Sequence, residues 1–349
     1  MRDIFDLTLN DLAADIAEAG FEKYRAKQIW NWIYKKGFSD FNEMANLPKK
    51  LQNYLKDNFA INQLSIVTEQ KSKDGTIKWL FALADGKEIE TVFIPEEKRG
   101  TLCISSQVGC TLNCKFCHTG TQLWQKNLTT AEIIAQIFYA KQLVGEFAAE
   151  RKLITNIVFM GMGEPLLNYD NVKKVCKTII LAESFDFSWR KVTVSTSGII
   201  PRIKDIKNDL KVGLAISLHA SNEQLRTEIM PINKKYPLAE LLEVCKDYVV
   251  HTEQKIMLEY VMLENVNDTK EHVEELLDIV KNIPVKFNLI PFNSWPGCEY
   301  SSSSNNRIHK FSELLFNAGI EAPIRKTRGE DIFAACGQLK SFLTKEKKA

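Results

Sequence analysis

The chain has 349 residues, of which 45% are apolar and 26% are charged, and its formal net charge is +2. This length suits one large domain with a smaller one, and the near-neutral charge gives no general attraction to nucleic acid. No apolar run approaches the roughly 20 residues that cross a bilayer, so we expect no membrane-spanning segment. Eight irregularly spaced cysteines, with an acidic N-terminus that lacks the apolar core of a signal peptide, predict a cytoplasmic protein with metal or thiol chemistry.

Residues 1–58 are predicted to form a helical domain. Apolar residues recur at helical spacing before Gly20 and again before Gly37, and Pro48 is suited to the first turn of a third helix. Between Lys23 and Lys56 the chain carries eight basic and two acidic residues, a local charge of +6. This charge suits contact with RNA phosphates, although a solvated helix surface accounts for it equally well.

Residues 59–98 are predicted to form a small antiparallel β meander. The runs SIVTEQKS, TIKWLFAL and KEIETVFIP are rich in branched and aromatic residues, which favour strands. Asp74-Gly75 and Asp85-Gly86 separate these runs, and such dipeptides favour tight hairpin turns.

Residues 99–349 follow a different rhythm, in which six apolar runs alternate with six helical stretches. The apolar runs lie near residues 101–106, 155–160, 191–196, 211–218, 255–263 and 285–291. The helical stretches lie near residues 129–144, 170–182, 199–207, 238–250, 269–281 and 306–318. Six such units predict a parallel sheet, and they fit an incomplete (β/α)6 barrel better than a full eight-stranded one. The predicted fold class is therefore α/β: this partial barrel with an N-terminal helical domain and a small antiparallel β extension.

Cys110, Cys114 and Cys117 place three thiols in one short loop, in the run CTLNCKFC, which offers no fourth cysteine. Thiolates suit iron-sulfur clusters, and a cluster iron without a protein ligand stays open to bind another molecule. A structural zinc site completed by His118 competes less well, because adjacent Cys and His ligands give poor tetrahedral geometry. Residues 114–118 also match the Cys-x-x-Cys-His pattern for c-type haem, which would need export, and a simple redox pair would leave Cys110 unused.

Polar motifs follow four of the predicted strands, at the edge where such barrels place their chemistry. Glycines in the first motif allow close approach of the backbone to a ligand, a carboxylate can accept hydrogen bonds from an ammonium group, and hydroxyls can hold a ribose or a carboxylate. A buried, satisfied histidine and ordinary turn residues would explain members of this set without any ligand. The motif residues are Gly163 and Glu164, Ser195, Ser217 with Leu218 and His219, and Asn293.

The cysteine spacing C-x-x-x-C-x-x-C, with Phe116 before the last cysteine, resembles the radical S-adenosylmethionine (SAM) superfamily. Eight further runs resemble one family within it, the RlmN family of dual-specificity RNA methyltransferases, over nearly the whole chain. These runs are ETVFIP, CISSQVGC, GMGEPLLN, STSG, SLHA, MPINKKY, LIPFN and ACGQL.

The resemblance implies the cofactors and the residues that bind them. One 4Fe-4S cluster would be held by Cys110, Cys114 and Cys117, and two molecules of SAM would be used per turnover. Cys336 would carry the methyl group as S-methylcysteine, and a second SAM would be cleaved to a 5′-deoxyadenosyl radical that activates this group. SAM would be contacted by Phe116, Gly163, Glu164, Ser195, Ser217, Leu218, His219 and Asn293.

Two more roles follow only from the resemblance. Glu90 would accept the proton from the adenine, and Cys103 would be the resolving thiol that forms a transient disulfide with Cys336. From the residues alone, Glu90 could be an exposed strand residue and Cys103 a small buried apolar side chain. His118 departs from the family pattern, because many relatives have alanine there, and the resemblance gives it no role. The cysteines at 176, 245 and 298 are interpreted as structural.

The implied reaction is methylation of carbon 2 of adenine in the peptidyl-transferase region of 23S rRNA and beside the anticodon in tRNA. The resemblance also implies an electron-donor protein such as flavodoxin, and we expect a monomer. Cfr-type enzymes methylate carbon 8 of adenine and share the cluster and both catalytic cysteines, but the motifs GMGEP and STSG favour RlmN. A radical SAM enzyme acting on a small molecule, and a cluster or zinc protein that only binds RNA, are less favoured hypotheses.

Overall fold

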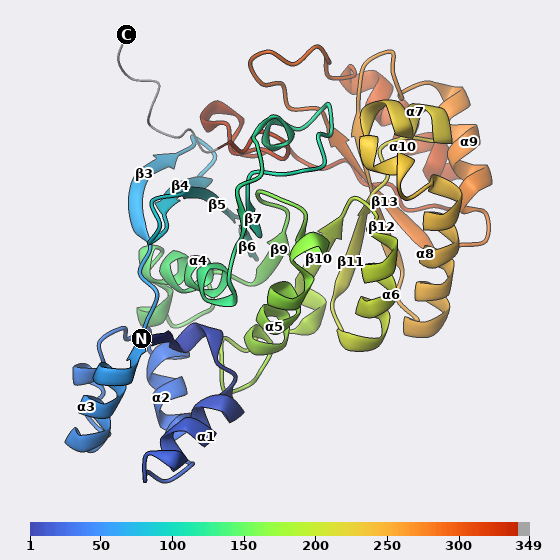
Figure 1. The fold of residues 1–349 in the computed structure, drawn as a ribbon. Helices are drawn as coiled ribbons and strands as arrows, with labels where there is room; N and C mark the ends of the chain where they lie inside the picture. Colours follow the sequence, from blue (N-terminus) through green and yellow to red (C-terminus); the bar gives the residue numbers. More distant parts are fainter. Residues whose placement is uncertain (341–349) are drawn as a thin grey trace.

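The computed structural model describes residues 1–340, and its first unit is helical. Helices α1 (Leu9–Glu18), α2 (Arg25–Tyr34) and α3 (Lys49–Asn58) lie together at one end of the molecule (Figure 1). Thr8 and Asp11 form a reciprocal capping box that starts α1, and Pro48 precedes the first turn of α3. Strands β1 (Arg2–Asp3) and β2 (Phe59–Ala60) pair in parallel and join the two ends of this unit.

One sheet of nine strands, in the order β13-β12-β11-β10-β9-β6-β5-β4-β3, forms the centre of the fold. Strands β3 to β6 pair antiparallel, and β6 to β13 pair parallel, so the meander continues the barrel sheet through the β5–β6 pair. A separate short ribbon joins β7 (Gln107–Val108) to β8 (Lys126–Asn127). The sheet strands are β3 (Ser65–Lys71), β4 (Ile77–Ala82), β5 (Glu88–Pro95), β6 (Gly100–Cys103), β9 (Asn156–Phe159), β10 (Val192–Thr196), β11 (Gly213–Ser217), β12 (Ile256–Met262) and β13 (Val285–Pro291).

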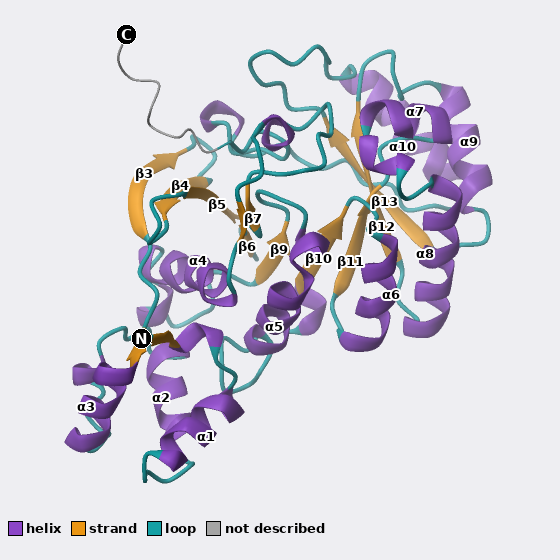
Figure 2. Cartoon of the chain, viewed as in Figure 1, coloured by secondary structure: helices purple, strands orange, loops and turns teal. Residues whose placement is uncertain are grey.

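Each of the six parallel strands is followed by helix, and the helices lie outside the curved sheet (Figure 2). The helices are α4 (Thr130–Leu143), α5 (Tyr169–Ile179), α6 (Ile200–Asp209), α7 (Glu223–Ile229), α8 (Leu238–Thr252), α9 (Lys270–Val280) and α10 (Asn305–Asn317). The predicted α/β fold with an incomplete barrel is therefore confirmed. No helix within residues 1–340 is long and apolar enough to span a membrane.

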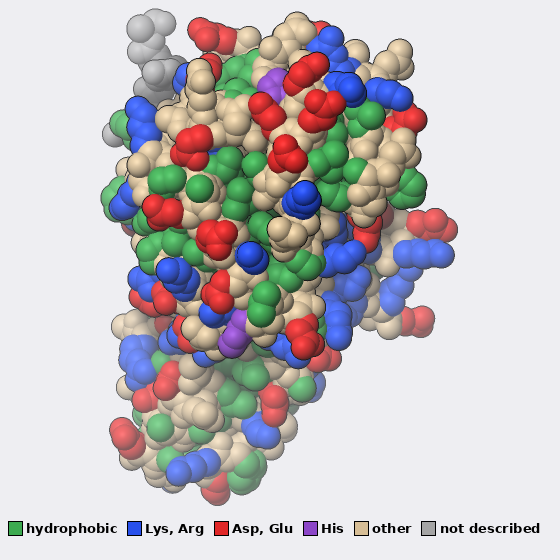
Figure 3. Space-filling model, turned by 90° about the vertical axis from the view of Figure 1, so that its right-hand side faces the viewer, with side chains coloured by type: hydrophobic (Ala, Val, Ile, Leu, Met, Phe, Trp, Pro, Cys, Tyr) green, Lys and Arg blue, Asp and Glu red, His purple; other side chains and the backbone are tan. Residues whose placement is uncertain are grey.

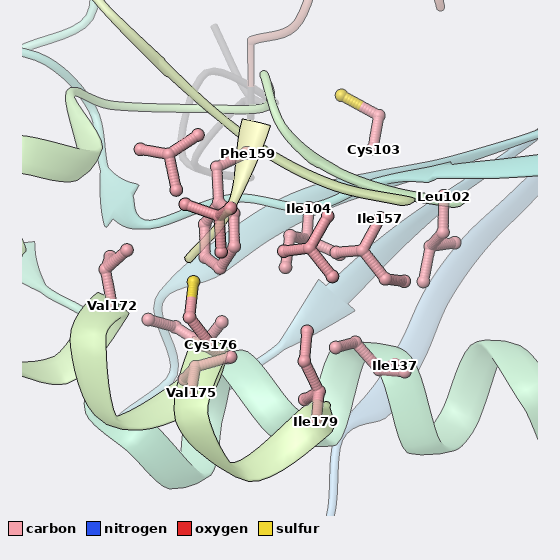
Figure 4. Packing of buried hydrophobic residues seen from close by; sticks show 14 of the residues in the cluster. Leu102, Cys103, Ile104, Ile137, Ile157, Phe159, Val172, Val175, Cys176 and Ile179 are labelled. Carbon is pink, nitrogen blue, oxygen red and sulfur yellow. The ribbon is translucent and has the colours of Figure 1, made fainter. Parts of the chain in front are cut away.

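Apolar side chains between the sheet and the helices form the main core (Figure 4). Leu102 of β6 and Ile157 of β9 face Ile137 of α4 and Ile179 of α5, and all four are fully buried. Burying each such side chain contributes roughly 1.5–3 kcal/mol. Because side chains alternate along a strand, Cys103 points to the opposite side of the sheet from Leu102, into the barrel.

The segment of residues 321–340, here called the C-terminal strap, crosses the open side of the barrel. At its start, Ile324 bridges to Leu289 of β13 in parallel, and the amide of Arg325 donates to the carbonyl of Leu289 at 2.8 Å. The strap then reaches the β3–β4 hairpin, where Ser72 donates to the carboxylate of Asp331 at 2.6 Å. It returns to the barrel as residues 334–340, which carry Cys336. Acidic and basic side chains are intermingled over the upper part of the face in Figure 3, as expected for a nearly neutral chain.

Candidate active site at the carboxyl end of the barrel

The carboxyl ends of the strands and the cysteine loop border one cavity, which contains about 940 Å³ of space including its open mouth. The cysteine loop follows β7, and the other walls come from the ends of β9, β10, β11 and β12. Most of the residues predicted from the sequence to bind cofactors meet here. They are Cys110, Cys114, Phe116, Cys117, Gly163, Glu164, Ser195, Ser217 and His219.

The cysteine loop is held in shape by its own backbone. The amide of Cys117 donates to the carbonyl of Cys114 at 3.1 Å, and the amide of Gly120 donates to the carbonyl of Cys117 at 3.0 Å. A Cβ atom at Gly120 would lie 2.9 Å from the carbonyl oxygen of Cys114, so the loop needs glycine there. Burial raises the pKa of each of the three thiols, that of Cys110 to about 12. Negative charge on neighbouring loop sulfurs raises the pKa of Cys110 and Cys114 further, and Cys336 does the same for Cys117.

These thiols fit an iron-sulfur cluster by their shared position. The three thiols border one cavity, and their pKa values are raised. They therefore need a nearby positive charge to ionise to thiolates, and iron supplies that charge. Within residues 1–340, no three His, Cys, Asp or Glu side chains are arranged around a single metal ion. The cysteines of a 4Fe-4S cluster bind different irons, so they do not have to converge on one point.

Glu164 is placed by the glycine turn after β9. Its two carboxylate oxygens accept the amide of Leu166 at 3.0 Å and the amide of Ser197 at 2.8 Å. Gly163 has φ +95°, and a Cβ there would lie 2.5 Å from the Cβ of Gln107, so only glycine fits the turn. Burial raises the pKa of Glu164, while these amides oppose the shift. A buried carboxylate at the cavity wall can hold an ammonium group such as the one in SAM.

His219 is held by a hydrogen bond within the fold and also lines the first cavity. Its Nδ1 accepts the amide of Val261 at 3.0 Å, so the neutral ring carries its proton on Nε2. Burial, reinforced by the charge of Arg226, lowers the pKa of His219 to about 3, which keeps the ring neutral. Phe116 packs edge-on against this ring, with centroids 4.6 Å apart. The satisfied buried histidine considered from the sequence is therefore present, but it also lines the site.

Two predicted SAM contacts do not line this cavity. Leu218 is fully buried, and its amide donates to the carbonyl of Glu259 at 3.0 Å. Asn293 instead lines a second cavity, which lies on the other side of Cys336, and its Nδ2 donates to the carbonyl of Cys336 at 3.1 Å. In this structure Asn293 positions the backbone of the strap.

Cys336 borders both cavities, and Cys103 borders the second one with it. Both thiols are free in this structure. Burial raises the pKa of Cys103, the nearby Cys336 sulfur raises it further, and the guanidinium of Arg325 opposes the shift. Burial also raises the pKa of Cys336, and Arg325 again opposes it. The predicted pair of thiols is thus brought to one cavity that also holds a cation.

Glu90 lines neither cavity, and its carboxylate is covered by the end of the strap at Lys340. Its Oε1 is 2.9 Å from the ammonium nitrogen of Lys78, and its Oε2 accepts the amide of Lys340 at 2.7 Å. Burial raises the pKa of Glu90, and the charge of Lys78 opposes this shift. Glu90 is therefore a buried, paired carboxylate, and neither the exposed strand position considered from sequence nor free access to a substrate applies here.

Sequence reasoning missed two charged residues at the site. Glu259, on β12, lines both cavities. Its Oε2 accepts a hydrogen bond from the Ser195 hydroxyl at 3.3 Å, and its Oε1 lies 3.9 Å from a guanidinium nitrogen of Arg325. A carboxylate inside the apolar run IMLEYVM was the available signal for Glu259. Arg325 carried no such signal, because it lies in the strap, which has no regular apolar period.

Family comparison agrees with this architecture. The model for the radical SAM superfamily matches residues 104–280, and the model for the ribosomal RNA large subunit methyltransferase N-terminal domain matches residues 2–61. Membership of the radical SAM superfamily implies a 4Fe-4S cluster and SAM.

Similar proteins point to one family within this superfamily. A dual-specificity RNA methyltransferase RlmN from Parvibaculum lavamentivorans is 50% identical over 93% of this chain and 84% of its own length. The dual-specificity RNA methyltransferase RlmN from Rhodospirillum rubrum is 47% identical over 98% of this chain and 81% of its own length. The crystal structure of a radical SAM methyltransferase from Sphaerobacter thermophilus superposes with a TM-score of 0.92, at 39% identity, covering 97% of this chain and 99% of that one. These relatives do not favour a Cfr-type enzyme, and the chain belongs to the RlmN family of radical SAM RNA methyltransferases.

Proposed function

We propose that this protein methylates carbon 2 of adenine in the peptidyl-transferase region of 23S rRNA and beside the anticodon of tRNA. The observation that carries the proposal is the position of Cys336 between two cavities. One cavity holds the three cysteines of the cluster loop, and the other holds Cys103. A methyl-carrying cysteine needs both cavities. At the first it would receive and activate a methyl group, and at the second a thiol would release it from its product.

The first cavity would hold the cofactors. Cys110, Cys114 and Cys117 would bind one 4Fe-4S cluster, and Glu164 would receive the ammonium group of SAM. Ser195 and His219 would contact other polar groups of the same molecule. When bound, the cluster and SAM supply the electron and the 5′-deoxyadenosyl radical, and the proposal includes two SAM molecules per turnover.

Cys336 would be the nucleophile that accepts a methyl group. As a thiolate it would attack the methyl carbon of SAM, the bond from that carbon to the sulfonium sulfur would break with its electron pair on the departing sulfur, and S-methylcysteine would form. Arg325 supports this role because its positive charge favours the thiolate of Cys336. Carbon 2 of adenine is a poor nucleophile, so a methyl group carried on cysteine and activated as a radical avoids a direct polar transfer.

Release of the product would use Glu90 and Cys103. Glu90 would take the proton from carbon 2 of the adduct, which requires the amide of Lys340 to move off its carboxylate. After the adduct radical has given up one electron and this proton, the Cys103 thiolate would attack the sulfur of Cys336 and form the transient disulfide. The bond from that sulfur to the methylene carbon would break, and this carbon would keep the electron pair and take up a proton to become the methyl group. The shared cavity of the two thiols supports this step.

The N-terminal helices would contact RNA. This unit matches the family model for ribosomal RNA methyltransferases, and Lys35 and Lys36 are exposed at the end of α2. The Lys36 ammonium lies 3.6 Å from the centre of the Trp32 ring, a contact that leaves it at the surface. Lys35 and Lys36 could therefore meet RNA phosphates while the target base is extruded into the site. A flavodoxin-type electron donor, a monomeric state and a cytoplasmic location complete the proposal, and they rest on the resemblance to the family.

An anaerobic assay tests the proposal. The reconstituted protein is incubated with a reductant, SAM and either 23S rRNA or tRNA, and the nucleosides are analysed by mass spectrometry. We expect 2-methyladenosine from both RNAs, none from Cys336→Ala, and normal product from Cys176→Ala, which removes a core thiol outside both cavities. Formation of 8-methyladenosine would indicate a Cfr-type activity, and SAM cleavage without any methylated adenosine would refute an RNA adenine substrate.

A further inference from the structure

His118, directly after the third cluster cysteine, contacts the strap rather than facing the cofactor cavity. Its amide donates to the carbonyl of Gly337 at 2.7 Å, and its Nδ1 lies 3.2 Å from the carbonyl oxygen of Gln338. The hydroxyl of Thr119 donates to the carbonyl of Leu339 at 2.5 Å. Three successive carbonyls after Cys336 are therefore held by two successive residues of the cysteine loop.

The loop after β13, which carries Ser294 and Trp295, also contacts both the cysteine loop and the strap. The His118 ring stacks on the indole of Trp295, with centroids 4.7 Å apart and planes 7° from parallel. The indole nitrogen of Trp295 donates to the carbonyl of Phe116 at 3.1 Å. The side chain of Gln338 donates to the carbonyl of Ser294 at 2.7 Å. The cysteine loop, the loop after β13 and the strap are thus tied together around the His118 ring.

The chemistry of the Nδ1 contact fixes the role of the ring. A carbonyl oxygen can only accept, so Nδ1 of His118 must carry the proton and donate. His118 is buried, with 8% of the residue exposed, and the flat packing of its ring on Trp295 leaves the ring little rotational freedom. His118 therefore supplies a fixed donor to the strap, two residues beyond Cys336.

We propose that His118 is the positioning residue that holds Cys336 in register with the cluster and SAM. The inference rests on the proposed function, and it assigns a role to a residue of the cysteine loop for which the family resemblance gave none. Hydrogen abstraction from the S-methyl group requires close and aligned approach, and a displacement of about 1 Å can cost roughly a hundredfold in rate. Alanine at position 118 keeps the backbone bond to Gly337 but loses the ring and its donor.

The bonds from His118 and Thr119 to the carbonyls of residues 337–339, here called the clamp, also connect Cys336 to Glu90. Residue 340 follows the clamped carbonyls at once, and its amide occupies the Glu90 carboxylate. While His118 holds residues 337–339, Cys336 is in place for activation and Glu90 is covered. Movement of this short segment would also take the Lys340 amide off Glu90, so we expect the position of Cys336 and the covering of Glu90 to be coupled.

Hydrogen exchange and product partition test the role of His118 in the cluster-loaded protein. His118→Ala removes the ring, His118→Phe retains a ring against Trp295 without a donor, and His118→Asn retains a short donor. His309→Ala, on the exposed side of α10, is the matched control. Exchange is measured without RNA for the peptide containing residues 336–340, and the yield of 2-methyladenosine per 5′-deoxyadenosine is measured with RNA.

We expect exchange to accelerate about fivefold in His118→Ala and His118→Phe, the factor for losing one neutral hydrogen bond. Their yield of 2-methyladenosine per 5′-deoxyadenosine should fall at least tenfold while SAM cleavage continues, and His118→Asn should recover most of both properties. Unchanged exchange, an unchanged yield, or an Asn variant as loose as Ala would each overturn the inference. A wild-type protein that makes no methylated adenosine would instead refute the proposed function, while the exchange comparison would still report on the clamp.

Discussion

Replacing Lys78 with methionine would test the buried ion pair that holds Glu90. The ammonium of Lys78 is 2.9 Å from Glu90 Oε1, and the two side chains are 9% and 5% exposed. Lys78 also donates to the carbonyl of Phe333 at 3.1 Å, so it fixes the strap as well as the carboxylate. Methionine fills the volume of the lysine stem but leaves the buried carboxylate without its cation.

Removing one partner of a buried pair costs about 3–5 kcal/mol, because the remaining charge is buried and uncompensated. The cost should depend on pH in a defined direction. Burial already raises the pKa of Glu90 above its usual value, so its contribution to stability is present at low pH and is lost as the pH rises through the folded-state pKa. Without Lys78 this pKa rises further, and Lys78→Met should be least destabilising at pH 5 and most destabilising at pH 8.

Urea unfolding followed by tryptophan fluorescence at both pH values measures this effect. Lys310→Met is the control, since Lys310 and Glu313 form an exposed pair of little energetic value. The double variant Lys78→Met/Glu90→Leu should recover most of the lost stability, because both charges are then absent. A loss for Lys78→Met no larger than for Lys310→Met, or one independent of pH, would refute the argument. Under the proposed function, the acidic limb of the pH profile of methylation should move to higher pH, because Glu90 must be ionised to accept a proton.

Three further predictions address the proposed sites. Cys103→Ala should accumulate a covalent protein–RNA adduct, detected as a shifted band on a denaturing gel. Release of the RNA at the wild-type rate would show that Cys103 is not the resolving thiol. Gly163→Ala should weaken SAM binding roughly 5- to 100-fold in equilibrium dialysis, because the φ of +95° and the approach to Gln107 exclude a Cβ, and retained affinity would contradict the predicted strain. Lys35→Glu with Lys36→Glu should weaken RNA binding and reduce the slope of log affinity against log salt by about 2, with SAM cleavage intact; unchanged affinity would place both residues outside the interface.

The repeating pattern of the barrel could be predicted because it depends on local signals. Branched strand runs and helical spacing gave six βα units, and polar residues at strand ends follow from the shared edge of parallel strands. Ser195, Ser217 and His219 meet at the first cavity for this reason. The short helix α7, Glu223–Ile229, was missed because its seven residues give too few turns for a clear period.

Contacts between distant parts of the chain could not be predicted in the same way. The strap has no regular period, and its position depends on bonds such as the one between Ser72 and Asp331, which are 259 residues apart. The lysine partner of Glu90 comes from a neighbouring antiparallel strand, and its second partner comes from the strap. The roles proposed for Glu90 and Cys103 rest on family resemblance alone, because isolated carboxylates and thiols have many ordinary positions in a fold.

The location of Cys336 on a strap has a physical reason. Residues of the parallel strands such as Glu259 also border both cavities, but their backbone is held by the ladder hydrogen bonds of the sheet, whereas Cys336 lies outside any strand. The strap is joined to β13 at Arg325 and to the β3–β4 hairpin at Asp331, and beyond these contacts it is held by hydrogen bonds from loop residues such as His118 and Thr119. Gly337, with φ +83°, turns the chain directly after Cys336. Because the amide of Lys340 donates to Glu90 in the same segment, we expect movement of the proposed methyl carrier, Cys336, and exposure of the proposed proton acceptor, Glu90, to be coupled.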